Sequence, residues 1–261
     1  RVGDAPPQRG RPLPRPGDHM SALTFVGCDT GLEGAFASLT FDPAASLVLA
    51  VRLAVMPTRT RDEGGREILT LATVDALRTV APNGWARCLI ERPVRGGMGP
   101  QGRGVEFAQG DAHGVARAVL DLEAHRLSCP VPEPAFVGGG KGWHAQLDMQ
   151  SAREAGVNRK TLSINVAENL LAHLHSQGAT VHGLAPCRGY SGLLGGQQAP
   201  RSGAADALLL AWLGLRMWLG VRSGAPTNSL DPTWVPEPKV KAPRVRKPPH
   251  IPPAATPESQ G

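Results

Sequence analysis

The chain has 261 residues, 41% of them hydrophobic and 4% aromatic, with 32 Gly, 25 Pro and a formal net charge of +6. This length and apolar content support one large domain or two small ones, and they exclude a chain that is disordered throughout. Residues 1–20 and 222–261 hold 15 of the prolines and most of the excess positive charge, whereas residues 21–221 are nearly neutral. We therefore expect a disordered Pro/Arg-rich N-terminal extension (1–20), one folded domain (21–221) and a disordered basic Pro-rich C-terminal tail (222–261).

The first half of this domain predicts strands followed by a helix. Residues 23–29 form a short apolar run that ends on an acid and a turn, which is typical of a buried strand. Two further strand-like runs, 35–41 and 46–55, predict an antiparallel meander. Apolar residues at helical spacing then predict a helix over about 68–80, and residues 87–91 predict another strand that ends on an acid.

The second half predicts helices that alternate with short strands. Residues 92–104 contain five glycines and three arginines, which predicts a mobile basic loop. Apolar spacing then predicts helices over 105–122 and about 160–177, and strands near 135–137 and 179–184. Residues 204–219 are almost wholly apolar and predict a helix buried on most sides, with Asp206 in its first turn. Strands first, then helices alternating with short strands, indicate an α/β fold with a mixed sheet.

The cysteines and the apolar runs bear on the compartment in which the protein works. Cys28, Cys88, Cys129 and Cys187 are scattered without a C-x-x-C pair, which is typical of a reducing compartment. No apolar run near the amino end resembles a signal peptide, and the longest charge-free apolar run, 207–215, is too short to span a bilayer. We expect a cytoplasmic protein without a membrane partner. We also expect Met20 to be the natural start and residues 1–19 to be a leftover.

Three acids, Asp29, Glu91 and Asp206, each interrupt or end one of the most apolar stretches of the chain. A buried carboxylate is costly unless a partner or a metal compensates its charge. Taken singly, each acid has an ordinary explanation: a turn former at Asp29, a strand-end ion pair at Glu91 and a favourable helix-start charge at Asp206. Taken together, two strand ends and a buried helix that can converge favour one shared site.

Several carboxylates without a His or Ser partner favour chemistry with a hard divalent cation. Two Mg²⁺ (or Mn²⁺) ions can activate a water and stabilise the leaving oxygen in phosphodiester hydrolysis. We expect Asp29, Glu91 and Asp206 to be both catalytic residues and metal ligands, with Asp29 binding both ions, and we expect no small-molecule cofactor.

The segments around these acids resemble the motifs of RuvC-type Holliday junction resolvases. Residues 25–35 (Phe-Val-Gly-Cys-Asp-Thr-Gly-Leu-Glu-Gly-Ala) resemble the first-strand motif, residues 89–91 (Leu-Ile-Glu) the second, and residues 204–211 (Ala-Ala-Asp-Ala-Leu-Leu-Leu-Ala) the carboxy-terminal helix motif. Gly110 and Gly114, in the helix predicted after the basic loop, resemble the pattern of the family's phage and organelle branch more than that of its cellular enzymes. The resemblance, over residues 23–219, implies a ribonuclease H-like mixed five-stranded sheet flanked by helices. It also implies metal-binding acids and a homodimer that nicks four-way junctions symmetrically. A resolvase of this kind would work in the cytoplasm of a bacterial or phage-infected cell.

The sequence departs from this family pattern at one place. Many members carry a fourth acid three or four residues before the last Asp, where this chain has Gly203 and Ser202. The departure implies that the second metal ion has fewer direct protein ligands or is held through water.

The glycine-rich loop directly after Glu91 is a candidate for DNA contact. Its arginines, Arg92, Arg95 and Arg103, are cations on a flexible backbone, which suits phosphates and a distorted junction. The alternative is an ordinary solvated loop.

Other basic residues add to this candidate interface. Lys141, Arg159 and Lys160 flank a glycine turn and a helix start and are possible phosphate ligands, with solvated surface as the alternative. The basic tail adds sequence-independent affinity for DNA or serves solubility alone. The helix over 105–122 contains small residues that allow close packing, and it is our candidate dimer surface.

These observations predict a divalent-metal-dependent endonuclease that resolves four-way (Holliday) DNA junctions by phosphodiester hydrolysis with a metal-activated water. One alternative is a non-cleaving branched-DNA-binding protein of the same fold. A second takes Asp29-Thr30-Gly31 as an aspartic-protease tripeptide, although the chain has no second copy and its helices disagree with an all-β protease. A zinc site at His173, His175, His182 and Cys187 is disfavoured, because two His two positions apart diverge on a helix.

Overall fold

The computed structural model of the chain describes residues 22–60, 62, 66–92, 102–136, 142–147, 149, 158–183 and 198–220. The N-terminal extension and the C-terminal tail expected from composition lie outside these residues, as does most of the basic loop.

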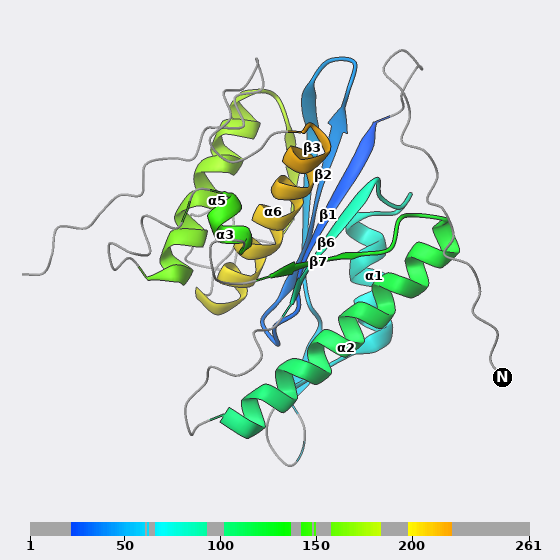
Figure 1. Cartoon of the computed structure of the whole chain (residues 1–261), viewed down its shortest axis with the longest axis vertical. Coiled ribbons are helices and arrows are strands. Elements are labelled where there is room, and N and C mark those ends of the chain that lie inside the picture. The colour runs from blue at the N-terminus through cyan, green and yellow to red at the C-terminus, as the bar shows by residue number, and fades with distance from the viewer. Residues whose placement is uncertain are drawn as a thin grey trace, which may run out of the picture.

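A mixed sheet of six strands forms the centre of the domain (Figure 1). In spatial order the strands are β7 (Glu133–Phe136), β6 (Arg87–Arg92), β1 (Leu23–Asp29), β2 (Ala35–Asp42), β3 (Leu47–Val55) and β8 (Thr180–His182). β2 runs antiparallel to both of its neighbours, and the other adjacent pairs are parallel. The α/β class and the mixed sheet are confirmed, and the strand order is consistent with a ribonuclease H-like fold. The sheet has six strands where five were expected, because the three residues of β8 pair with the edge of β3.

Helices cover both faces of this sheet (Figure 1). α1 (Thr70–Val80) and α2 (Gly102–Leu127) lie on one face, and α5 (Arg159–Ser176) and α6 (Gln198–Trp218) lie on the other with the short α3 (Trp143–Gln146). A separate hairpin of β4 (Thr58–Thr60) and β5 (Arg66–Ile68) precedes α1. The sequence analysis did not predict this hairpin or α3. None of the helices in the described part is long and apolar enough to cross a membrane.

The two faces of β1 pack against different helices. Val26 and Cys28 belong to the cluster formed with α1 and α2, whereas Phe25 belongs to the cluster formed with α5 and α6. Because successive side chains of a strand point to opposite faces, Asp29 projects toward the same side as Phe25. The alternation therefore aims the acid at the end of β1 toward α6.

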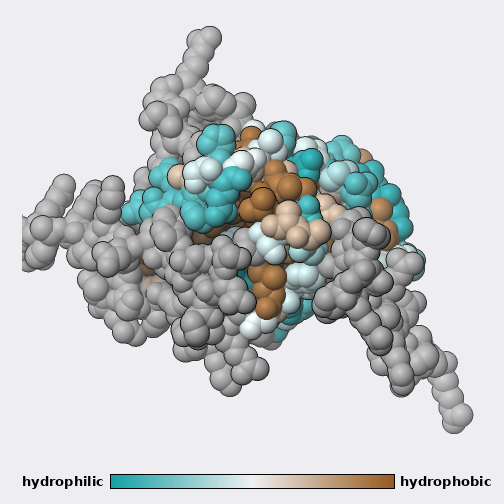
Figure 2. Space-filling view, turned by 90° about the horizontal axis from the view of Figure 1, so that it is seen from above, coloured by the Kyte–Doolittle hydropathy of each residue, from teal (hydrophilic) through white to brown (hydrophobic). Residues whose placement is uncertain are grey.

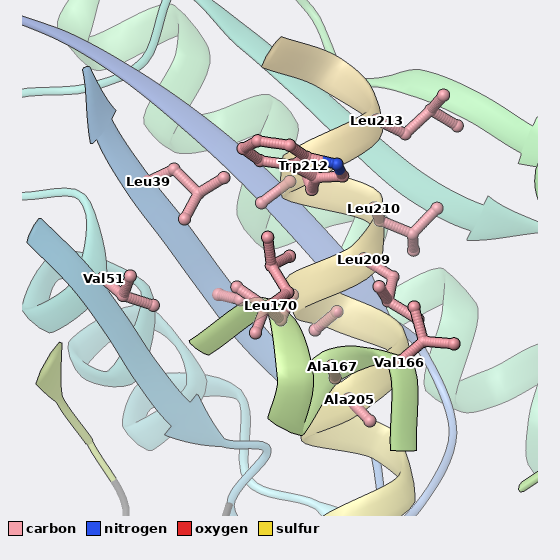
Figure 3. Packing of buried hydrophobic residues seen from close by; sticks show 14 of the residues in the cluster. Leu39, Val51, Val166, Ala167, Leu170, Ala205, Leu209, Leu210, Trp212 and Leu213 are labelled. Carbon is pink, nitrogen blue, oxygen red and sulfur yellow. The ribbon is translucent and has the colours of Figure 1, made fainter. Parts of the chain in front are cut away.

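α6 lies between the sheet and α5, which explains its nearly continuous apolar sequence. Residues 202–216 are all buried, and Figure 3 shows Leu39 and Val51 of the sheet on one side of α6 and Ala167 and Leu170 of α5 on another. The prediction of a helix buried on most sides is confirmed.

The starts of two helices differ from those expected. α6 begins at Gln198 rather than at residue 204, because Pro200 lies in the first turn, where its missing N–H is tolerated. Asp206 is therefore about two turns inside the helix, and the explanation of this acid as a helix-start charge is wrong. α2 begins at Gly102, so residues 102–104 are helical rather than part of the loop. A glycine costs a helix only about 1 kcal/mol, and a helix of 26 residues tolerates it.

Some large apolar side chains remain at the surface. Figure 2 shows hydrophobic residues between hydrophilic regions on one face of the molecule. Among the described residues the most exposed are Leu71 on α1, Val131 before β7 and Leu122 on α2.

Glycines allow α6 and the turn after β1 to approach each other with their backbones in contact. A Cβ added at Gly27 of β1 would overlap the Ala207 carbonyl oxygen of α6. A Cβ at Gly203 of α6 would overlap the carbonyl oxygen of Glu33, and one at Gly34 would overlap that of Asp29. These positions exclude side chains because the atoms they would meet belong to the backbone.

We predict that Gly27→Ala lowers the free energy of unfolding by about 2–3 kcal/mol, because α6 must shift away from β1. Gly214→Ala is the matched control on α6: the nearest atom to its added Cβ, Leu89 Cγ, lies at an ordinary contact distance of 3.7 Å, so the free energy of unfolding should change by less than about 1 kcal/mol. Urea unfolding of the three proteins measures both effects. Equal stability of the two variants would contradict the close-packing argument.

Candidate metal centre

Asp29, Glu91 and Asp206 come together at one edge of the sheet. Each offers a carboxylate oxygen, and the three oxygens lie within 4.8 Å of one another. Asp29 ends β1 and Glu91 lies near the end of the parallel neighbour β6, where the register pairs Cys28 with Ile90. Because the carboxyl ends of parallel strands share one edge and the two acids share one face, both meet α6 at Asp206. Among the described residues this is the one group of three or more His, Cys, Asp or Glu side chains placed to hold a metal ion.

Local hydrogen bonds fix the ends of the two strands. The Gly31 N–H donates to Asp29 Oδ1 at 3.0 Å, so Asp29 does form the turn that the sequence suggested. The Thr30 hydroxyl donates to the Glu91 carbonyl oxygen at 3.2 Å and joins the end of β1 to β6. The turn therefore uses one oxygen of Asp29. The other, Oδ2, lies 3.0 Å from the position of an added Cβ at Gly203.

Burial and mutual repulsion hold these carboxylates in an unfavourable charged state. Burial, followed by the charge of Glu91, raises the pKa of Asp206 to about 7, although the Arg159 guanidinium and the Ser163 hydroxyl oppose the shift. Burial, then Glu91 and Asp206, also raises the pKa of Asp29 well above its ordinary value. The cluster is thus a place where added positive charge is strongly favoured.

The donor set fits a hard divalent cation. All three side chains supply carboxylate oxygens, the ligands that Mg²⁺ and Mn²⁺ prefer. Asp206 Oδ1 is buried and accepts no hydrogen bond from any described residue. A buried oxygen without a donor is costly, and a cation at the cluster would satisfy it.

Arg159, the first residue of α5, is the charged partner of the cluster. Its Nη2 lies 2.8 Å from Glu91 Oε1 and 3.5 Å from Asp206 Oδ2. Its Nε donates to His144 Nε2 at 3.2 Å, and His144 is buried and stacked on Trp143. The sequence analysis considered Arg159 as a possible phosphate ligand and missed its contact with the acids. No local signal announces this contact, because Arg159 meets residues far from it in the chain.

The structure also explains why the fourth acid is missing. Gly203 faces the turn after β1, and the backbone of Glu33 and Gly34 occupies the space that a side chain there would need. Ser202, the other possible position, is buried. An acid at position 203 is therefore incompatible with this packing of α6.

The basic residues predicted to contact DNA are described only in part. Arg92 follows Glu91 on β6 and is exposed, and Lys160 follows Arg159 on α5 and is exposed. Lys160 is close enough to lower the pKa of Asp206 by its charge. Arg103 lies in the first turn of α2, but its side chain is outside the described residues, as are Arg95 and Lys141 altogether.

The other sites weighed from the sequence receive no support. His173, His175 and His182 do not form a metal-binding group in the described part of the chain, and Cys187 lies outside it. Asp29-Thr30-Gly31 ends a strand of an α/β domain rather than a lobe of an all-β protease.

We predict that the metal-free chain loses stability as pH rises from about 4 to 7. Asp206 keeps its proton in the folded state up to a pKa of about 7, whereas the unfolded chain releases it near the ordinary value. The folded state binds more protons in this window, so raising the pH disfavours folding. Asp206→Asn should reduce this loss by about 2 kcal/mol, measured by urea unfolding in chelator. Asp75→Asn, at an exposed position of α1, is the control, and an unchanged slope in Asp206→Asn would contradict the assignment.

A comparison with solved structures finds similar chains, whereas comparisons with family models and with curated proteins find none. Among solved structures, the chain is similar to T. thermophilus RuvC in complex with Holliday junction substrate, with 13% sequence identity and a TM-score of 0.32. The similarity covers 77% of this chain and 98% of that chain.

Proposed function

We propose that this protein is a divalent-metal-dependent endonuclease that resolves four-way (Holliday) DNA junctions by phosphodiester hydrolysis. The observation that carries the proposal is the convergence of Asp29, Glu91 and Asp206, whose carboxylate oxygens lie within 4.8 Å in largely buried surroundings. The resemblance of the three surrounding segments to the resolvase motifs supports the choice of substrate.

Each acid has a distinct role in this proposal. Asp29 would bind both of two Mg²⁺ or Mn²⁺ ions, while Glu91 and Asp206 would complete the sets of protein ligands. The ions supply Lewis-acid charge that activates a water and stabilises the leaving oxygen of the phosphodiester. Thr30 and Gly31 hold the end of β1 so that Asp29 keeps one oxygen directed to the cluster.

Cations around the cluster would hold the DNA backbone. Arg92 adjoins Glu91 of the cluster, and Lys160 adjoins Arg159, the cluster's charged partner. Both are exposed and carry the charge that phosphates require. We assign the same role to Arg95, Arg103 and Lys141, which belong to segments near these elements in the sequence.

Symmetric cleavage of a junction requires two copies of the site, so we propose a homodimer formed through α2. Gly110, Gly114, Ala118 and Leu122 follow one another at intervals of four and are all exposed, so they form one outward stripe of the helix. Nothing lies within 4 Å of a Cβ added at Gly110 or Gly114. The stripe would let a second α2 approach closely, with Leu122 buried between the two copies.

We predict that Asp29→Asn lowers cleavage of a synthetic four-way junction in Mg²⁺ or Mn²⁺ by more than about 100-fold. Loss of groups that merely support a ligand already costs about 10- to 100-fold, and a direct ligand costs more. Asp75→Asn is the control, because Asp75 lies exposed on α1 and outside the cluster. Intact cleavage by Asp29→Asn would contradict the metal assignment. Tight junction binding without product at any concentration of either ion would instead favour the non-cleaving branched-DNA-binding protein.

A second prediction concerns the dimer. Gly114→Arg places a charge on the outward stripe of α2 and should yield a monomer that nicks junctions on one strand at a time. The isolated subunit has open space for this side chain, so its stability should change little. Leu71→Arg is the control, because Leu71 is 82% exposed on α1. Light scattering after size-exclusion chromatography measures the oligomeric state, and a dimeric Gly114→Arg would contradict the choice of α2.

A further inference from the structure

We propose that Arg159 is the built-in counter-cation of the carboxylate cluster, and that a divalent ion binds by displacing its guanidinium from Glu91 and Asp206. This inference rests on the metal site of the proposed function, and it concerns how that site accepts an ion. One guanidinium nitrogen, Nη2, contacts oxygens of both acids, at 2.8 Å and 3.5 Å. The same two side chains would have to bind the metal.

The charges at the cluster make Arg159 and a metal ion competitors. Three carboxylates with Arg159 leave two negative charges when all groups are ionised, which one divalent ion neutralises. A second ion then meets a neutral cluster, whereas one negative charge remains to attract it if the guanidinium leaves. The chain cannot supply a further carboxylate at Gly203, because backbone atoms of Glu33 and Gly34 fill that space. The presence of Arg159 and the absence of a fourth acid therefore limit how much positive charge the cluster can bind.

An arginine guanidinium stays protonated in proteins, so Arg159 must leave the cluster as a cation. Because it contacts the same carboxylates that would bind a metal ion, the guanidinium competes with that ion by charge.

The position of Arg159 allows it to move without unfolding its helix. Asn158 caps α5 by accepting from the Lys160 and Thr161 N–H groups, so the backbone at the helix start is held independently of the arginine side chain. The Arg159 side chain is 36% exposed, which places it at the rim of the cluster with a path to solvent. Rotation of the side chain alone would release Glu91 and Asp206 and also break the bond to His144.

The test is Mn²⁺ binding to the full chain without DNA, measured by isothermal titration calorimetry after chelator treatment. Arg159→Gln should bind Mn²⁺ about tenfold more tightly than the wild type, because a half-exposed ion pair no longer has to break. Arg78→Gln is the matched control. It also removes an arginine that pairs with a buried acid, Glu123, but this pair lies outside the cluster, so the Mn²⁺ affinity should change by less than about twofold. Arg159→Gln should also melt at a lower temperature than the wild type in chelator, and this difference should shrink when Mn²⁺ is added.

The possible outcomes separate this inference from the proposed function. Equal Mn²⁺ affinity in wild type and Arg159→Gln, or a gain no larger than that of Arg78→Gln, would overturn the role of Arg159 and leave the metal site intact. Binding that is absent in wild type and both variants, or that persists in Asp29→Asn, would overturn the metal site and this inference with it. If Arg159→Gln fails to fold in chelator, Arg159→Lys serves in its place. Its shorter side chain should give an intermediate gain, and unchanged affinity would overturn the inference.

Discussion

The packing of α6 directly on the backbone of β1 holds both the core and the carboxylate cluster in place. The Ala207 carbonyl oxygen of α6 lies so close to Gly27 that a Cβ at this position would overlap it. Asp206 is the residue before Ala207, so the contact that closes the core also brings this acid to the end of β1. The turn after β1 repeats the arrangement, since Gly34 and Gly203 let it press against the start of the buried part of α6. Core stability and the geometry of the acids therefore depend on the same glycines.

This packing forces three acids into surroundings that oppose their charge. Burial and repulsion raise the pKa of Asp206 to about 7 and raise the pKa of Asp29 well above its ordinary value. Protons and the Arg159 guanidinium compensate part of this charge, and Asp206 Oδ1 still lacks a donor among the described residues. The arrangement is costly for the fold and favourable for a cation. Such a combination is typical of a functional site rather than of a structural ion pair.

Elements with a clear period were predictable, and those without one were not. The run of apolar residues along β1 and along the buried part of α6 follows from their burial in the core. Apolar spacing therefore located this strand and this part of the helix correctly. The start of α6 was misplaced because Pro200 and Gly203 are typical of loops. Pro200 lies in the first turn, where the helix tolerates it, and Gly203 lies where the turn after β1 packs directly against the helix. The β4–β5 hairpin was missed because strands of three residues carry too little pattern, whereas β8 lies within the strand expected near residues 179–184.

The sequence by itself determined that three carboxylates lie in apolar stretches and need a compensating charge, because local hydropathy and spacing can be followed along the chain. It also determined that an acid is missing at Ser202 and Gly203. Only the tertiary structure decided that the three acids converge within 4.8 Å, that Arg159 meets two of them and that Gly203 has no room for a side chain. These facts depend on contacts between segments that are far apart in sequence. No local pattern specifies which distant segments meet, because that choice is made by the packing of the whole core.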